Sequence, residues 1–242
     1  MKNQLNFWSN ALPDGYYDKV LKTDTKKKSG MQGMWHHLSY KIVSKSIDKN
    51  DNHLDYACGP GSLIGLYLEC VSTGYDFANN QIEYAKKNYP ENKNFFTSDL
   101  AEVDKNAPYS KITIMGLLEY LTDEEIENLF EFLKSRLREN GKIIITSPNY
   151  RSSLKFIEIV ANKIGVVDYS PVNINKLNKL KLHNLASKHF ENIKITKIIN
   201  FGIFFSIINH DLGTKVEKLF SELFNNFFGF LLLAELSIKK PS

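Results

Sequence analysis

The sequence predicts an α/β fold built on a doubly wound, seven-stranded, mostly parallel sheet. From about residue 51 onward, strand-like runs alternate with helix-like runs, which is the pattern of a parallel sheet covered by helices on both faces. A glycine-rich turn at residues 55–61 follows the first buried strand, and acidic residues follow the next two strands, at Asp76 and Asp99. Open α/β sheets bind ligands at the carboxyl ends of their strands, so we expect these loops to form one site.

Length and hydrophobic content suit one domain with additions. The chain has 242 residues, of which 43% are hydrophobic, and this is ample for a single core. We divide it into a helical N-terminal cap or lid, residues 1–50, and a ligand-binding domain, residues 51–242. The domain carries an insertion after strand five, at about residues 150–180.

Charge and cysteine content exclude several functional classes. The net charge is +4, but the lysines are spread along the chain without a basic stripe interleaved with aromatics, so we expect no nucleic-acid partner. Cys58 and Cys70 have neither disulfide nor metal spacing, and free thiols fit a reducing cytoplasm. We expect no metal site, no signal peptide and no transmembrane segment, because the apolar run at residues 227–234 is too short to span a bilayer.

The first 50 residues divide into an irregular part and a helix. Residues 6–18 are predicted to be irregular and aromatic, and the lysines at residues 26–28 are placed in a loop. Residues 31–47 are predicted to be a helix, because apolar residues recur there at helical spacing. This helix either packs on the sheet as core or forms a lid that excludes water. In the lid interpretation, the substrate pocket is lined by side chains from Tyr16, Tyr17, Trp35 or His37.

The elements of the first half are placed by alternation and by turn residues. They are a strand ending near Tyr56, a helix from about Gly61 to Glu69, a strand ending at Asp76, a helix at residues 79–88, a strand at residues 94–97, a loop at residues 104–110 broken by Pro108, and a strand at residues 111–116.

In the second half, Thr122 and Glu125 form the pattern of a capping box at the start of a helix. We expect that helix to run to about Glu139, where Asn140 and Gly141 stop it. The later elements are a strand at residues 142–146, helices at residues 153–164 and 180–189, a strand at residues 193–199, an apolar aromatic stretch at residues 201–210, an amphipathic helix at residues 214–225 and a last strand at residues 230–238.

The glycine turn narrows the choice of cofactor. A dinucleotide fingerprint begun at Gly59 and Gly61 would place its third glycine where Ile64 stands. The segment Asp55-Tyr56-Ala57-Cys58-Gly59-Pro60-Gly61 instead resembles the first motif of the class I S-adenosylmethionine-dependent methyltransferases, acidic-x-Gly-x-Gly-x-Gly, with Ala57 in place of the first glycine. The resemblance covers most of residues 30–240. Within the family, the chain is similar to a branch of bacterial small-molecule and surface-glycan methyltransferases.

Three further segments carry the resemblance, at residues 74–85, 119–122 and 146–152. The family's Glu-His-Leu element reads Glu119-Tyr120-Leu121, and residues 172–175 stand where members often have Gln-His-Ile. Both histidines are absent, so no catalytic role is assigned at those positions. The resemblance implies that the last strand runs antiparallel between strands five and six. It also implies S-adenosylmethionine as cofactor and S-adenosylhomocysteine as product.

The resemblance also implies a set of cofactor-binding residues. Asp76 would bind the ribose hydroxyls, Asp99 the adenine amine, and Asp55 the methionine end. Each carboxylate could instead cap a turn or helix locally, and Phe77 could be ordinary core rather than a stacking partner of adenine. The full set is Asp55, Tyr56, Ala57, Cys58, Gly59, Gly61, Asp76, Phe77, Gln81, Asp99, Leu100, Gly116 and Leu117.

Methyl transfer from a sulfonium is an in-line displacement, so alignment of acceptor and methyl group is the main task. A hydroxyl or amine acceptor can also need a general base, for which Glu119, His37, His36 and Tyr17 are candidates, although either histidine could be structural. The expected acceptor is a small molecule or sugar methylated on oxygen or nitrogen. Two rivals stay open: a methyltransferase-like scaffold without turnover and a nicotinamide-linked oxidoreductase. The oligomeric state is left open.

Overall fold

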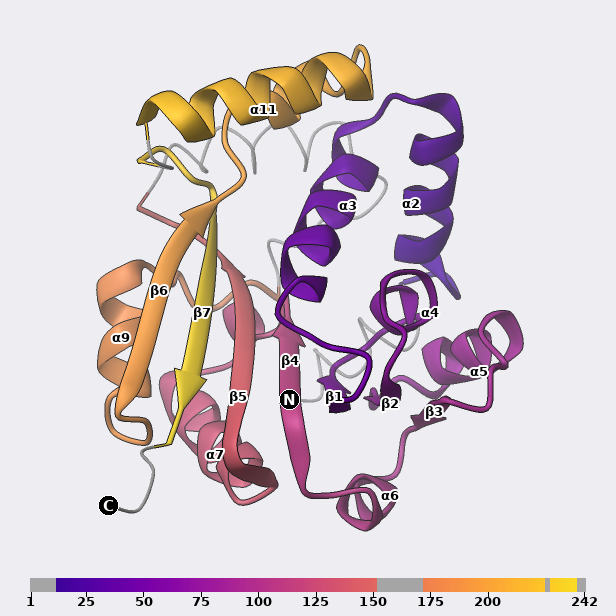
Figure 1. Ribbon diagram of the computed structural model, residues 1–242, viewed down its shortest axis with the longest axis vertical. Helices are drawn as coiled ribbons and strands as arrows, with labels where there is room; N and C mark the ends of the chain where they lie inside the picture. The colour runs from indigo at the N-terminus through magenta and orange to yellow at the C-terminus, as the bar shows by residue number, and fades with distance from the viewer. Residues whose placement is uncertain (1–11, 152–171, 225–226, 239–242) are drawn as a thin grey trace.

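The computed structural model describes residues 12–151, 172–224 and 227–238. A seven-stranded sheet with the strand order β3-β2-β1-β4-β5-β7-β6 runs through the middle of the molecule (Figure 1). All neighbours are parallel except β7, which is antiparallel to both β5 and β6. The predicted fold class and the predicted place of the last strand are confirmed. The strands are β1 (Asn52–Tyr56), β2 (Val71–Tyr75), β3 (Asn94–Thr97), β4 (Tyr109–Met115), β5 (Leu137–Pro148), β6 (Asn192–Ile198) and β7 (Leu231–Ser237).

Helices cover both faces of the sheet. The helices are α2 (Tyr16–Lys27), α3 (Met31–Ser44), α4 (Ser62–Tyr67), α5 (Asn79–Asn88), α6 (Leu100–Lys105), the 3-10 turn η2 (Leu118–Tyr120), α7 (Asp123–Lys134), α9 (Lys179–Ala186), α10 (Gly202–Phe205) and α11 (His210–Phe224). Helices α3, α4 and α5 cover one face, and α6, α7 and α9 cover the other. Within the described residues, no helix is both long enough and apolar enough to cross a membrane.

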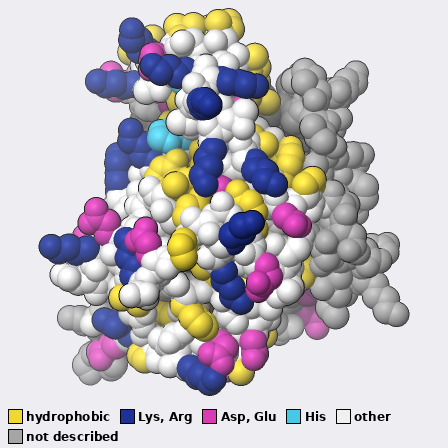
Figure 2. Space-filling model, turned by 90° about the vertical axis from the view of Figure 1, so that its right-hand side faces the viewer, with side chains coloured by type: hydrophobic (Ala, Val, Ile, Leu, Met, Phe, Trp, Pro, Cys, Tyr) yellow, Lys and Arg dark blue, Asp and Glu magenta, His cyan; other side chains and the backbone are white. Residues whose placement is uncertain are grey.

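The core is double because the central strands are buried on both faces. In β5, Ile143 and Ile145 pack on the side of α7 and α9, whereas Ile144 between them packs on the side of α4 and α5. All three side chains are fully buried. This explains why β5 reads as a continuous apolar run rather than an alternating one. Lysines and acidic residues are interspersed over the face that carries α2 and α5 (Figure 2).

The prediction that the lysines at residues 26–28 lie in a loop was wrong, because Lys26 and Lys27 form the last turn of helix α2. Asp18 stands in its first turn, so the charges at the two ends match the helix dipole. The irregular stretch predicted for residues 6–18 is wrong at its end, because α2 already begins at Tyr16. Residues 6–11 lie outside the described residues. The 31–47 helix is confirmed as α3, which ends at Ser44.

Several other element boundaries were wrong. Strand β5 is longer than the strand predicted at residues 142–146, α9 ends at Ala186 rather than at residue 189, and α11 begins at His210 rather than at residue 214. The predicted loop at residues 104–110 is partly helix, because Asp99 caps α6 with a bond from the Ala101 N–H (2.9 Å). The helix that begins with the confirmed Thr122–Glu125 capping box ends at Lys134, not at Glu139, because β5 already begins at Leu137. Burial of Leu137 and its pairing with Tyr109 override the local Asn-Gly stop signal. The predicted helix at residues 153–164 lies outside the described residues.

Helices α10 and α11 stand between β6 and β7, at the edge of the sheet where the parallel strands end (Figure 1). Met34 of α3 packs there with Ile203 of α10 and Phe230. Two backbone bonds join this region to the end of α2: Gly30 donates to Ser206 (2.8 Å), and His210 donates to Lys28 (2.8 Å). The junction of α2 and α3 therefore lies against helices α10 and α11 at the carboxyl edge of the sheet.

Asp18 fastens α2 to the two helices beneath it. Its fully buried carboxylate accepts hydrogen bonds from Ser62 at the start of α4 (2.8 Å), from Tyr84 (2.7 Å) and from Tyr89, and it pairs with Lys22 (2.8 Å). Burial alone would raise the pKa of Asp18, but the hydrogen bonds outweigh it and lower the pKa. The carboxylate is therefore ionised at neutral pH and acts as a shared acceptor.

We expect Asp18→Ala to lower the free energy of unfolding by about 3–5 kcal/mol, because it leaves three hydroxyl donors without their buried acceptor. Urea denaturation of the purified variant measures this. Asp14→Ala is the matched control, since Asp14 is exposed and its carboxylate accepts a hydrogen bond from the half-buried Asn80 amide (2.8 Å), and it should change stability by about 0.5 kcal/mol or less. Equal denaturation midpoints for the two variants would contradict the role of Asp18.

Candidate active site

The glycine turn between β1 and α4 is built from left-handed residues. Ala57, Gly59 and Gly61 have φ values of +66°, +51° and +76°. A Cβ on Gly61 would lie 2.7 Å from the ring of Phe96, so that glycine is required for packing. A Cβ on Gly59 would meet nothing within 4 Å. The turn therefore has open space beside Gly59, as a cradle for a bound ligand requires.

The backbone of Ala57 is strained, because a left-handed conformation costs an L-residue about 1–2 kcal/mol. We expect Ala57→Gly to raise the free energy of unfolding by about 0.5–1 kcal/mol, after the greater freedom of glycine in the unfolded chain is subtracted. Thermal and urea denaturation measure this. A destabilised variant would show that the methyl group of Ala57 makes packing contacts worth more than the strain.

Asp76 follows β2 and faces the glycine turn. Its Oδ2 accepts the N–H of Gly59 (2.8 Å), and its Oδ1 accepts the N–H of Ala78 (2.9 Å). Burial raises the pKa of Asp76, and these two bonds partly offset the effect. A carboxylate offers about four lone-pair sites, so two stay available for the hydroxyls of a ribose. The predicted ribose role and the alternative turn-capping role are therefore compatible in one side chain.

Asp55 ends a buried hydrogen-bonded chain. The Thr113 hydroxyl donates to Asp55 Oδ1 (2.6 Å), and His53 lies behind it with Nε2 2.9 Å from Thr113 Oγ1 and Nδ1 3.1 Å from Ser72 Oγ. Burial lowers the pKa of His53 to about 3, so the ring is neutral. When Asp55 is ionised, the Thr113 hydroxyl donates its hydrogen to the carboxylate and can only accept from His53. The neutral His53 ring therefore carries its proton on Nε2. His53 and Thr113 were not predicted.

Asp55 itself has an unbalanced charge. Burial raises its pKa to about 7, the Thr113 bond lowers it, and the negative charge of Asp76 raises it further. Among the ion pairs of the described residues, none involves Asp55. A buried carboxylate without a cation is costly, and a ligand with an ammonium group would relieve that cost. This fits the predicted methionine end of the cofactor.

The loops after β2 and β3 place apolar side chains beside these carboxylates. Phe77 is 39% exposed and Leu100 is 38% exposed, so both can contact a planar base. The Asp99 side chain caps α6, which was the alternative to its adenine role, and its second oxygen accepts no bond among those described. Gln81 is buried and its amide holds the start of α2, by accepting from Gly15 (3.0 Å) and donating to Pro13 (3.3 Å). The predicted cofactor role of Gln81 stays a prediction.

Glu119 lies at the end of β4, within η2. A Cβ added to Gly116, which has a φ of +65°, would be 3.6 Å from Glu119 Oε1. The carboxylate is buried, and Ser147 donates to it at 3.4 Å. Burial raises the pKa of Glu119 to about 7. The structure thus places a carboxyl that exchanges its proton near neutral pH beside the predicted cofactor residues Gly116 and Leu117.

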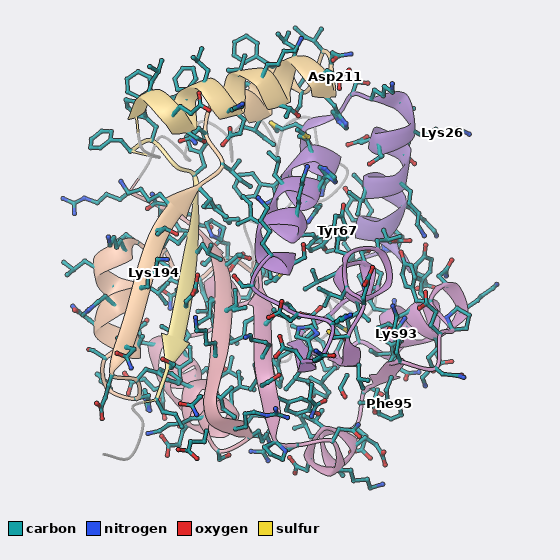
Figure 3. All side chains as sticks on the ribbon, in the orientation of Figure 1. Lys26, Tyr67, Lys93, Phe95, Lys194 and Asp211 are labelled. Atoms are coloured by element: carbon teal, nitrogen blue, oxygen red, sulfur yellow. The ribbon has the colours of Figure 1, made fainter. Side chains whose placement is uncertain are left out.

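The cap supplies a row of aromatic rings. Tyr17 contacts His36 (ring centroids 5.1 Å apart), His36 contacts Tyr40 (5.8 Å), and Tyr40 contacts Tyr67 (5.4 Å). Figure 3 shows Tyr67 between α3 and α4, where its hydroxyl lies 2.8 Å from Nδ1 of His37. Burial lowers the pKa of His36 to about 4, and burial followed by the charge of Asp55 raises that of Tyr40. The row therefore reaches the neighbourhood of Asp55.

The other predicted residues lie around the turn. The side chain of Tyr56 lies on the face of the sheet that α7 covers, where it packs on Tyr75 and Phe132. Cys58 is buried under the turn, and burial raises the pKa of its thiol. Trp35 belongs to the cluster shared with α10 rather than to the aromatic row. Sequence reasoning missed Tyr40 and Tyr67, whose only signal was an aromatic residue on a predicted helix.

A seven-stranded sheet with an antiparallel seventh strand, a glycine turn and acidic residues after β2 and β3 define a class I S-adenosylmethionine-dependent methyltransferase. A family model described as a methyltransferase domain, Methyltransf_23, matches residues 34–196. Because the match covers more than half of the chain, the protein belongs to this family of S-adenosylmethionine-dependent enzymes. No curated protein matches the sequence significantly.

Solved structures show the same fold at low sequence identity. Magnesium protoporphyrin IX methyltransferase from Synechocystis PCC 6803, with bound S-adenosylhomocysteine, is 11% identical with a TM-score of 0.58, covering 98% of this chain and 99% of that chain. The PH0226 protein from Pyrococcus horikoshii OT3 is 15% identical with a TM-score of 0.58, covering 97% and 96%. A methyltransferase from Archaeoglobus fulgidus is 18% identical with a TM-score of 0.52, covering 82% and 94%.

Proposed function

We propose that the protein transfers a methyl group to an oxygen or nitrogen atom of a small-molecule or sugar acceptor. The observation that carries the proposal is the buried carboxyl of Glu119, whose pKa is raised to about 7 at the carboxyl end of β4. S-adenosylmethionine, when bound, supplies an electrophilic methyl group on a sulfonium. A general base near neutrality is useful for an acceptor that must lose a proton, as hydroxyls and ammonium groups must.

The cofactor roles follow from the geometry of the turn. Asp76 binds the ribose hydroxyls with the lone pairs that Gly59 and Ala78 leave free. Asp55 holds the ammonium group of the methionine end, and Thr113 keeps that carboxylate in position. The residues Phe77, Asp99 and Leu100 surround the base, and the backbone of residues 57–61, 116 and 117 lines the remainder.

Glu119 accepts the acceptor's proton. At a pH below the pKa of Glu119, its carboxyl is protonated and cannot accept a proton from the acceptor. At a pH above that pKa, Glu119 is ionised, and the Ser147 hydroxyl stabilises the carboxylate. Tyr17 and His37 are assigned to the wall of the acceptor pocket rather than to proton transfer, because Tyr17 packs on the His36 ring and His37 is bonded to the Tyr67 hydroxyl. Closing this wall over the site would exclude water from the reacting atoms.

The aromatic row suits a ring-shaped acceptor. Tyrosine and histidine rings offer apolar faces with polar edges, a combination that packs on a sugar or on an aromatic small molecule. We place the reaction in the cytoplasm, since the two free cysteines, Cys58 and Cys70, fit a reducing compartment. Residues 152–171 of the insertion lie outside the described residues, so the acceptor is assigned only by class.

The test uses S-adenosylmethionine carrying a labelled methyl group, with panels of nucleotide sugars, monosaccharides, phenols and amines. We expect the label to appear in one acceptor class, together with an equal amount of S-adenosylhomocysteine, and mass spectrometry to place it on oxygen or nitrogen. Methylation on carbon or sulfur would overturn the proposed acceptor chemistry. Calorimetric binding of S-adenosylhomocysteine without any transfer, including to a small-molecule extract of the source cells, would favour the non-catalytic scaffold.

The pKa of about 7 for Asp55 makes cofactor binding pH-dependent. Only the ionised carboxylate attracts an ammonium group, so we expect the affinity for S-adenosylhomocysteine to fall about tenfold per pH unit below pH 7. Stability moves the other way, because a folded-state pKa above the unfolded value means that protonation favours the folded protein. Calorimetry from about pH 5.5 to about pH 8 measures the affinity.

Asp55→Asn is the control for this titration. The amide keeps the size of the side chain but loses the charge, so the affinity should be weaker and nearly independent of pH across the same range. A variant whose affinity kept the slope of the original protein would assign the titration to another group, such as Asp76, whose pKa burial also raises.

A further inference from the structure

Helix α11 turns a polar side toward the protein. The N–H of Asn200 donates to both carboxylate oxygens of Glu217 (2.7 and 2.8 Å), and its side-chain amide donates to Glu217 (3.0 Å) and Ser221 (3.2 Å). Gly213 packs so closely on α10 that a Cβ on Gly202 would lie 2.4 Å from its carbonyl oxygen. Phe220 adds an apolar contact on this side, with its ring centroid 5.3 Å from that of Phe201.

The outer side of α11 is apolar. Leu212, Leu219 and Leu223 recur at a spacing of seven and four residues, which aligns them on one stripe. Leu219 is 51% exposed and Leu223 is 67% exposed. A surface helix normally turns such a stripe toward the core, so α11 has the reverse orientation. Exposed apolar stripes of this kind mark interaction sites.

Neighbouring segments carry further exposed apolar side chains. Of the sixteen large apolar side chains that are exposed within the described residues, nine lie in residues 205–228. We call these nine the α11 surface: Phe205, Ile207, Ile208, Leu212, Leu219, Leu223, Phe224, Phe227 and Phe228. Figure 2 shows hydrophobic side chains along the top of the molecule, where α11 lies in Figure 1. The surface is an outward ridge rather than a groove.

Positive charge gathers at one end of this ridge, where the end of α2 lies. The backbone bond from His210 to Lys28 (2.8 Å) brings the end of α2 against the start of α11, and Figure 3 shows Lys26 and Asp211 at that corner. The exposed charged side chains on and beside α11 are five lysines and two acids: Lys26, Lys27, Lys28, Lys215, Lys218, Asp211 and Glu222. A partner that combines an apolar interior with negative groups at its surface matches both features.

We propose that the α11 surface, together with the lysines at its border, docks the protein on an anionic lipid bilayer. Leucine and phenylalanine side chains of an interfacial helix enter the region between headgroups and acyl chains. Lysines extend along the helix and keep their ammonium groups near the lipid phosphates. A second copy docked through the same face would instead repeat the five lysines on both sides of one apolar seam.

The test is flotation of the full chain with two kinds of vesicle, phosphatidylcholine alone and phosphatidylcholine mixed with phosphatidylglycerol. We expect binding to the mixed vesicles and about tenfold weaker binding to the neutral ones. Leu223→Glu should weaken binding to the mixed vesicles about tenfold or more, because it places a charge in the apolar stripe. Changing Lys26, Lys27 and Lys28 to glutamine should remove most of the preference for the anionic lipid.

Leu180→Glu is the matched control, since Leu180 is a 62% exposed leucine on the distant helix α9. It should float like the original protein. Calorimetry with S-adenosylhomocysteine should give the same affinity for both variants, which separates loss of docking from loss of the enzyme's fold or function. Absence of vesicle binding by the original chain, or equal binding by Leu223→Glu, overturns the proposal. A dimer that Leu223→Glu converts to a monomer would assign the surface to a second copy.

Discussion

Replacing Asp76 with asparagine should weaken S-adenosylhomocysteine binding by roughly a hundredfold or more. The buried carboxylate accepts the N–H of Gly59 and the N–H of Ala78 through different oxygens, and in the proposed role its remaining lone pairs bind the ribose. An amide has one oxygen, so its NH₂ group must face one of the two backbone N–H donors. We also expect about 1–3 kcal/mol of lost stability. Calorimetry measures the affinity, and urea denaturation measures the stability.

Asp99→Asn is the comparison for this variant. Asp99 is exposed and caps a six-residue helix, so the amide can keep the cap and the affinity should fall by less than about tenfold. If Asp76→Asn stayed folded and bound S-adenosylhomocysteine within about threefold of the original affinity, the ribose assignment would be wrong. Asp76 would then be explained by its turn-capping bonds alone.

Glu119→Gln should lower kcat by about a hundredfold to ten-thousandfold once an acceptor is in hand, while cofactor affinity changes little. The pH–rate profile gives the sharper readout. The original enzyme should gain rate as pH rises through about 7, because the carboxyl must lose its proton to act. The glutamine variant should lack that limb of the profile, since its amide does not titrate.

Ser147→Ala separates proton transfer from support of the carboxylate. The Ser147 hydroxyl donates to Glu119 over a long 3.4 Å, so its removal should shift the acidic limb to slightly higher pH and reduce kcat by less than about tenfold. A Glu119→Gln enzyme with an unchanged kcat and profile would remove the general base from the mechanism. Transfer would then rest on alignment alone.

The sheet and the cofactor side of the site could be predicted because their signals are local. Helix α5 and strand β3 have the predicted bounds, since the turn at residues 88–92 separates two clean periodicities. The glycine turn and Asp76 can also be recognised from short stretches of sequence. The comparisons bear out the fold, the family and the cofactor, whereas the role of each site residue stays a prediction.

The contacts of Asp18 and the buried hydrogen-bonded chain behind Asp55 could not be predicted, because their partners lie far apart in sequence. Asp18 is a surface-type residue until Ser62 and Tyr84 surround it. His53 and Thr113 stand in separate strands, and only the parallel pairing of β1 with β4 brings them together. The end of α7 was missed for a similar reason, since Leu137 leaves the helix to pair with Tyr109.

The position of β7 affects how the protein is made. Synthesis proceeds from the N-terminus, so β6 and the helices α10 and α11 leave the ribosome before the strand that ties them to β5. Until β7 inserts, the nascent chain has an open β5 edge and a detached β6 with an apolar helix behind it. Such exposed edges and apolar faces are the features that chaperones bind. The sheet can therefore be completed only after β7, its last strand in sequence, has been made.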